Sequence, residues 1–156
     1  MKAPHIKKII SVEELEEVSK DIEALHKEDN EKHGHSLGLK HDVELITKCL
    51  SHESLLLWNT HVWAHNNGSK WDGIFIGIIR KSDKFNKKSM EEYLWLAKSS
   101  NAGIRLYNTA LKFAKENQCE YIAMNVVENH PLKEKIKSFY KRMGYVKDSE
   151  TYLKLL

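Results

Sequence analysis

Residues 104–126 read IRLYNTALKFAKENQCEYIAMNV, and the hydrophobic period of this stretch changes part-way along it. Its first half carries apolar residues at three- and four-residue steps, which is typical of a helix with one buried face. Asn117 can end that helix, and residues 119–127 then form an apolar run that predicts a buried strand. A helix that leads directly into a buried strand favours an α/β domain.

The residues after this stretch continue the alternation of helices and strands along the chain. Pro131 stands where proline is favoured, at the first position of a helix, and Gly144 is a typical helix terminator. The helix between them has one apolar stripe, made of Leu132, Ile136, Phe139, Tyr140 and Met143. Residues 145–148 and 151–155 predict two short closing strands.

The residues before this stretch predict a strand, two helices and a three-strand meander. Ser11 and Glu14 form a capping box, which predicts a helix that runs to about Lys32. Asp42 is a plausible cap for a second helix after a loop at 33–38. The predicted strands lie at 5–10, 55–65, 71–80 and 90–97, and Asn66-Asn67-Gly68 is a turn signal. The order is β-α-α-β-β-β-α-β-α-β-β, in a single domain over residues 1–156.

The composition excludes several classes of protein. The chain has 156 residues, of which 41% are apolar and 30% are charged, so it is neither disordered nor fibrous. It contains no apolar run of the roughly 18–20 residues that a membrane span needs. Cys49 and Cys119 form no Cys-x-x-Cys pair, and we expect two reduced thiols in a cytoplasmic protein. Nine histidines without a His-Glu-x-x-His pattern predict no metal site.

The net charge of +3 is unevenly distributed along the chain. Residues 1–53 carry 8 Lys/Arg and 12 Asp/Glu, a net charge of −4, whereas residues 54–156 carry 17 Lys/Arg and 10 Asp/Glu, a net charge of +7. A basic segment is compatible with an anionic small molecule or with nucleic acid. Its basic residues lack interleaved aromatic residues, which argues against nucleic acid.

Residues 138–156, SFYKRMGYVKDSETYLKLL, resemble a segment of the GNAT family of acyl-CoA-dependent N-acetyltransferases. The family has Phe/Leu-Tyr-x-x-x-Gly-Phe/Tyr there, followed by a closing hairpin, and residues 104–126 are similar to its cofactor-binding helix and the next strand. The resemblance covers residues 90–156, and residues 1–89 match in element order only. It implies a GNAT-like, mixed, mostly antiparallel twisted sheet flanked by helices. The chain also resembles small acyltransferase-like proteins of tailed bacteriophages.

The resemblance implies that coenzyme A binds at Lys98-Ser99-Ser100-Asn101-Ala102-Gly103. The family pattern is Gln/Arg-x-x-Gly-x-Gly/Ala, with backbone N–H groups holding the pyrophosphate at the positive end of a helix. Lys98 and Asn101 depart from this pattern, although asparagine tolerates the left-handed conformation of such a turn. The implied cofactor contacts are Leu96, Ala97, Lys98, Asn101, Ala102, Gly103, Ile104, Arg105 and Asn129. Asn129 could instead cap the following helix.

The resemblance also implies the catalytic residues. Tyr140 matches the tyrosine that protonates the leaving thiolate, although a tyrosine on an apolar stripe is also a common core residue. The general base would be Glu92 or, second, Glu91. Strand alternation places the two carboxylates on opposite faces, Glu92 with Leu94 and Leu96, and Glu91 with Tyr93 and Trp95. His61 could line the acceptor cleft.

The implied function is transfer of an acetyl group from acetyl-CoA to a primary amine by direct attack, without a metal. The acceptor would be a small-molecule or protein amine, and the protein would act in the cytoplasm, the host cytoplasm if it is phage-encoded. A homodimer is possible. The alternative is a catalytically degenerate GNAT-like fold that serves as a binding or virion-associated module.

Overall fold

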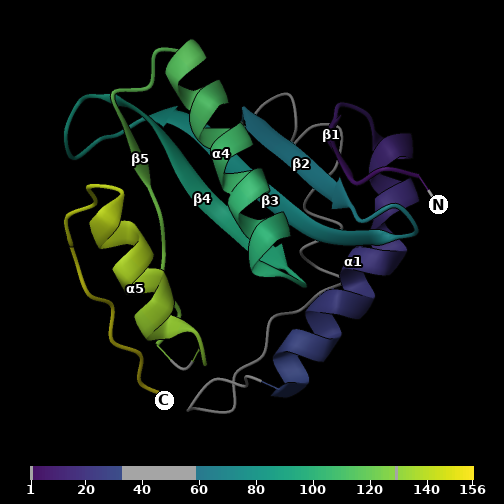
Figure 1. Cartoon of the computed structure of the whole chain (residues 1–156). Coiled ribbons are helices and arrows are strands. Elements are labelled where there is room, and N and C mark those ends of the chain that lie inside the picture. Colours follow the sequence, from purple (N-terminus) through teal and green to yellow (C-terminus); the bar gives the residue numbers. More distant parts are fainter. Residues whose placement is uncertain (1, 33–58, 129) are drawn as a thin grey trace.

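The computed structural model describes residues 2–32, 59–128 and 130–156 (Figure 1). The predicted loop at 33–38, the second helix from Asp42, and Cys49 lie outside these residues. The elements are β1 (His5–Ile9), α1 (Val12–Lys32), β2 (Thr60–Asn66), β3 (Trp71–Lys81), β4 (Lys88–Ala97), α4 (Ser100–Glu116), β5 (Tyr121–Ala123) and α5 (Lys133–Arg142). None of the helices in this part of the chain has the length and apolar character of a membrane span.

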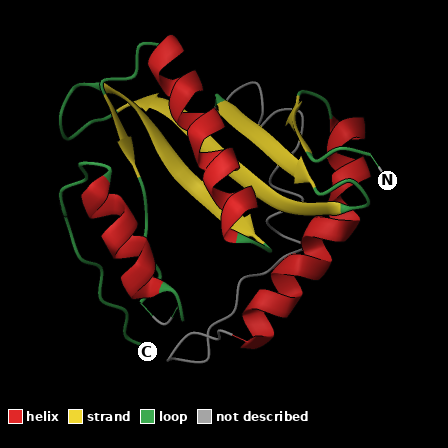
Figure 2. Cartoon of the chain, in the orientation of Figure 1, coloured by secondary structure: helices red, strands yellow, loops and turns green. Residues whose placement is uncertain are grey.

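The five strands form one sheet in the order β1-β2-β3-β4-β5 (Figure 2). The first four strands pair antiparallel with their neighbours, and β5 pairs parallel with β4. The predicted mixed and mostly antiparallel sheet is therefore confirmed. Its meander arises from short turns, because residues 66–70 join β2 to β3 and Gly68 adopts a positive φ of 103° that suits glycine.

Helices cover both faces of the sheet. Alternation along β3 sends Ile74 and Ile76 into a core cluster with α1, whereas Phe75 and Ile79 join a second cluster with α4. Figure 1 shows α4 crossing one face of the sheet and α5 lying at the β5 end.

The start of α1 confirms the predicted capping box. The Glu14 backbone N–H donates to Ser11 Oγ over 3.2 Å, and the Glu14 carboxylate accepts from the Ile10 N–H over 2.8 Å. The helix runs to Lys32, as the sequence predicts.

The two predicted closing strands at 145–148 and 151–155 are wrong. Residues 145–156 form no strand, and the side chains of Val146 and Tyr152 are 90% and 85% exposed. A strand needs a neighbour to satisfy its backbone, and none of the described strands pairs with this segment. The predicted strand at 119–127 is also shorter, because β5 pairs with β4 only at Ser89–Tyr121, Met90–Ile122 and Glu91–Ala123.

Candidate active site

A β-bulge interrupts β4 at Tyr93. The register pairs Ile76 with Leu94 and Gly77 with Glu92, so that Tyr93 has no partner residue on β3. A bulge of this kind inserts one residue and reverses the alternation of side chains beyond it. The bulge at Tyr93 lies two residues beyond Glu91, which forms with Ala123 the last pair between β4 and β5.

The bulge corrects the predicted faces of the two glutamates. Glu92 pairs with Gly77, on the same face of the sheet as Phe75 and Met90, which pack against α4. Beyond the bulge Trp95 shares that face, whereas Leu94 packs in the α1 cluster. The predicted grouping of Glu92 with Leu94 and Leu96 is therefore wrong, because simple alternation does not hold across a bulge.

Glu92 is a half-buried carboxylate with one strong hydrogen bond. Its Oε2 accepts from the backbone N–H of Asn125 over 2.8 Å. Burial raises the pKa of Glu92 to about 7, and the Asn125 N–H acts in the opposite direction by stabilising the ionised form. A carboxyl group that titrates near neutral pH can accept a proton from an amine far better than an ordinary glutamate.

Glu91 is bound in an ion pair on the other face. Its Oε2 lies 2.6 Å from the Arg80 guanidinium, which comes from the neighbouring strand β3. Glu91 is therefore engaged by Arg80 on the face of the sheet opposite Glu92.

Tyr140 lies on α5, close to Glu92. Its hydroxyl donates to the backbone carbonyl of Asn125 over 2.8 Å, and its ring stacks on Trp95 at a centroid distance of 6.4 Å. Burial is the main cause that raises the pKa of Tyr140, and the negative charge of Glu92 adds to it. The phenol therefore keeps its proton at neutral pH and can act as a proton donor.

An aromatic cluster surrounds these groups. The rings of Tyr107, Phe139, Tyr140, Tyr145 and Trp95 lie at centroid distances of 5.0 to 6.4 Å from one another. The hydroxyls of Tyr107 and Tyr145 share a hydrogen bond of 2.9 Å. Two of these rings lie close enough to Glu92 for its negative charge to contribute to the raised pKa of Tyr140 and of Tyr145.

The first turn of α4 presents unpaired backbone donors. Ser99 caps the helix, since its Oγ accepts from the Ala102 N–H over 3.2 Å and its carbonyl accepts from the Gly103 N–H over 3.0 Å. The N–H groups of Ser100 and Asn101 donate to no acceptor among the described residues. The left-handed conformation expected at Asn101 does not occur, because Asn101 already belongs to the helix.

Solved structures of acetyltransferases share this architecture over nearly the whole chain, although no family model matches the sequence and no curated protein does. An aminoglycoside acetyltransferase from an uncultured soil metagenomic sample, in complex with trehalose, has 15% identity and a TM-score of 0.66, with 98% of this chain and 97% of that chain covered. The ribosomal-protein-alanine N-acetyltransferase of Brucella melitensis biovar Abortus 2308 has 11% identity and a TM-score of 0.65, with 99% of each chain covered. The chain has the GNAT fold.

Leu96 and Ala97, the cofactor contacts predicted on β4, lie at the end of this strand that β5 does not cover. Both residues pair with β3 on one side, and no described strand pairs with their other edge, since β5 reaches only Glu91. Gly103 is buried beside this edge and its carbonyl accepts from the Trp95 indole N–H over 3.1 Å. Ala102 is buried in the same turn, and Ile104 is exposed.

The two basic residues predicted for the phosphates are engaged elsewhere. Lys98 Nζ lies 2.7 Å from Glu28 on α1. Lys32 and, after it, Lys98 lower the pKa of Glu28 to about 2. Arg105 contacts His65 Nε2 at 3.1 Å. His65 in turn is bound to Asp72 at 2.6 Å, in a buried chain below α4. Both cationic side chains near the α4 N-terminus therefore have partners among the described residues.

The remaining predicted residues are His61 and Asn129. His61 lies in the same row of the sheet as Glu92, since it pairs with Gly77 and Gly77 pairs with Glu92. Asn129 is not among the described residues. His61 packs against Phe113 at 4.6 Å and is bound to Asn59, and burial with the charge of Lys8 lowers its pKa to about 4. No group of three potential metal ligands occurs among residues 2–32, 59–128 and 130–156.

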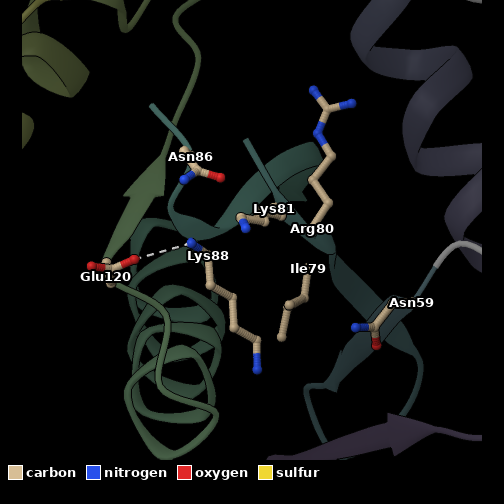
Figure 3. A pocket seen from close by; sticks show the side chains of 7 residues that line it. All are labelled: Asn59, Ile79, Arg80, Lys81, Asn86, Lys88 and Glu120. Atoms are coloured by element: carbon tan, nitrogen blue, oxygen red, sulfur yellow. Dashed lines mark hydrogen bonds between the residues drawn. The ribbon is translucent and has the colours of Figure 1, made fainter. Parts of the chain in front are cut away.

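A hollow of about 420 Å³ lies at the other end of the β3–β4 pair (Figure 3). It is lined by Asn59, Ile79, Arg80, Lys81, Asn86, Lys88 and Glu120. Lys81 and Lys88 are paired in the sheet register, and Glu120 accepts from the Lys88 backbone N–H over 3.2 Å. It includes none of the predicted catalytic or cofactor residues.

Sequence reasoning missed Asn125, which contacts both Glu92 and Tyr140. Asn125 is a polar residue inside the apolar run IAMNVV. A polar side chain in a predicted buried strand needs a hydrogen-bond partner, and this signal could have marked it as a candidate.

Proposed function

We propose that the protein is an acyl-CoA-dependent N-acetyltransferase that transfers an acetyl group from acetyl-CoA to a primary amine. The observation that carries this proposal is that Glu92, with a pKa of about 7, and Tyr140 both bind the backbone of one residue, Asn125, beside the bulge. The acetyltransferases that share the fold support it.

The co-substrate fits the donors that the chain offers. Coenzyme A carries an anionic pyrophosphate, and the free N–H groups of Ser100 and Asn101 stand at the positive end of α4. Its pantetheine arm contains amides, which can bond the open backbone edge of Leu96 and Ala97 as an added strand does. This arrangement directs the thioester toward the bulge at Tyr93.

The proposed reaction forms a C–N bond and breaks the C–S bond. Glu92 accepts a proton from the amine as its nitrogen attacks the thioester carbon. The backbone of the bulge, which the ladder leaves unpaired at Tyr93, can supply an N–H donor to the developing oxyanion. Tyr140 donates its proton to the leaving thiolate, and proton exchange with water restores both side chains.

The acceptor class that the site supports is a primary amine on a small molecule. One solved neighbour is an aminoglycoside acetyltransferase in complex with sisomicin, with 15% identity and a TM-score of 0.65. The net charge of −4 over residues 1–53 would attract a cationic amine. A catalytically degenerate binding module is the second candidate, because Lys98 and Arg105 are engaged by Glu28 and His65.

We expect Ser100→Pro to weaken acetyl-CoA binding by about tenfold, the loss expected for one hydrogen bond to a charged group. Ser100 is the first residue of α4, where proline is tolerated, and Ser99 before it is already extended at φ −130° and ψ 153°. The substitution therefore removes one N–H donor and leaves the helix intact. The measurement is the dissociation constant for acetyl-CoA by calorimetry.

Ser100→Ala is the matched control, because it keeps the N–H and should bind acetyl-CoA as the wild type does. In the wild type, acetyl-CoA at 100 times its dissociation constant should stabilise the fold by about 2.7 kcal/mol, and an equal concentration of acetate should not. If acetyl-CoA leaves the melting temperature of the wild type unchanged, the proposed function is refuted.

A further inference from the structure

Asn125 contacts both proposed catalytic groups through three different atoms. Its backbone N–H donates to Oε2 of Glu92 over 2.8 Å, and its backbone carbonyl accepts from the Tyr140 hydroxyl over 2.8 Å. Its side-chain Nδ2 donates to the backbone carbonyl of Glu92 over 3.1 Å. One residue therefore joins the base, the acid and the strand that carries the base.

We infer that Asn125 is the positioning residue of this site, whose side-chain amide fastens β4 at Glu92 so that its backbone N–H and carbonyl hold the carboxylate and the Tyr140 hydroxyl together. The inference rests on the proposed transferase function for its chemistry, and on the three contacts for its geometry.

The Asn125 side chain is needed because the regular pairing of β4 with β5 and with β3 is interrupted near Glu92. The last pair between the parallel strands joins Glu91 to Ala123, and β5 ends there. One residue beyond Glu92, β4 bulges at Tyr93. Two hydrogen bonds from Asn125 to Glu92, one from its backbone N–H and one from its side chain, join the two chain segments just beyond the end of the β4–β5 pairing.

Asparagine is suited to this position by the reach and polarity of its side chain. The group required is a hydrogen-bond donor close to the backbone, aimed at a carbonyl oxygen. Aspartate has the same shape but presents only acceptors when it is ionised, so it would repel the Glu92 carbonyl. Alanine offers no donor at all.

Among the described residues, the titratable groups around Glu92 include two tyrosines, its neighbour Glu91 and, across Gly77 on the same face, His61. Tyr140 faces it from α5, and Tyr145 follows α5 and is hydroxyl-bonded to Tyr107 of α4. Glu91 lies on the opposite face, paired with Arg80. Burial raises the pKa of Glu92, whereas the hydrogen bond from the Asn125 N–H lowers it by stabilising the carboxylate. Loss of this hydrogen bond should therefore raise the pKa of Glu92 further.

The test is Asn125→Ala, with Asn108→Ala on the exposed face of α4 as the matched control. We expect the pKa of Glu92, titrated by carboxyl-carbon NMR in the free protein, to rise by at least about 0.5 in Asn125→Ala and to stay constant in Asn108→Ala. We also expect kcat to fall about tenfold with KM for acetyl-CoA unchanged, because the α4 end of the site is untouched.

A double-mutant cycle separates positioning from a general structural role. If Asn125 acts through Glu92, the variant that combines Glu92→Gln with Asn125→Ala should be little slower than Glu92→Gln alone.

The inference is overturned if the two losses of kcat multiply, or if the pKa of Glu92 is the same in Asn125→Ala and the wild type. Should Asn125→Ala fail to fold, Asn125→Leu keeps a similar volume without a donor or a charge and is expected to raise the pKa of Glu92 likewise. The NMR titration needs no acetyl transfer. An inactive wild type would therefore refute the proposed function, but the pKa of Glu92 could still be compared between the wild type and Asn125→Ala.

Discussion

Glu92→Gln is expected to lower kcat for acetyl transfer to a primary amine by about 10²- to 10⁴-fold, the range for removal of a general base. Glutamine keeps the size of the side chain and can still accept from the Asn125 N–H, so the change removes the basic group and little else. The measurement is the release of coenzyme A thiol at pH 8. Glu91→Gln is the matched control and should stay near wild-type activity, because Glu91 is paired with Arg80 on the other face.

The same substitution should remove the pH dependence of the rate. In the wild type kcat/KM should rise about tenfold per pH unit below pH 7 and level off above it, because only ionised Glu92 accepts a proton and its pKa is about 7. For Glu92→Gln, the residual kcat/KM should not rise with pH below pH 7. A wild-type profile that is flat between pH 5 and 8 with the same amine would contradict the assignment.

The stability of the same variant should move in the opposite direction to its activity. Burial raises the pKa of Glu92 from 4.5 to about 7, so the folded state binds its proton more tightly than the unfolded state. The stability that this group provides is therefore present at low pH and is lost as the pH rises through 7. Above pH 7, Glu92→Gln should be more stable than the wild type, by about 1–3 kcal/mol in the free energy of unfolding.

Tyr140→Phe is expected to lower kcat by about 10²-fold with acetyl-CoA, because the leaving thiolate loses its proton donor. An acetyl thioester of a more acidic thiol needs less protonation, so the loss should shrink with such a donor. The measurement is the ratio of the wild-type and variant rates with the two donors. An equal loss with both would show that Tyr140 has a structural role only.

The control for Tyr140→Phe is Tyr152→Phe. The Tyr152 hydroxyl donates to Glu150 on an exposed segment, so its loss should not affect the rate. Some loss of stability is also expected in Tyr140→Phe, about 1 kcal/mol, since the Asn125 carbonyl loses its donor. The rate should therefore be measured well below the melting temperature.

The fold was largely predictable from local patterns. The change of period near Asn117, the capping box at Ser11 and the turn at Gly68 are signals that depend on residues close together in the chain. The predicted closing strands failed for the opposite reason. The pattern at 151–155 is strand-like, but a strand forms only where a neighbouring backbone is available, and local sequence does not carry that information.

The candidate site was predictable in its residues and not in its geometry. Glu92 and Tyr140 follow from the family resemblance, but the contact that joins them passes through Asn125, which is 33 residues from Glu92 and 15 from Tyr140. Lys98 was expected to face a phosphate, yet its partner Glu28 lies 70 residues away on α1. Such tertiary partners leave no trace in the residues beside them.

The bulge at Tyr93 also bears on how this chain is aligned with others. Residues 88–92 and 94–97 follow two alternations that are out of phase by one position. An alignment that matches inward and outward residues through β4 without a gap would therefore be correct on one side of Tyr93 and displaced on the other. Identities near 15% leave few matches to reveal the displacement. Aligning the two halves of this strand separately would keep Glu92 opposite its true structural counterparts.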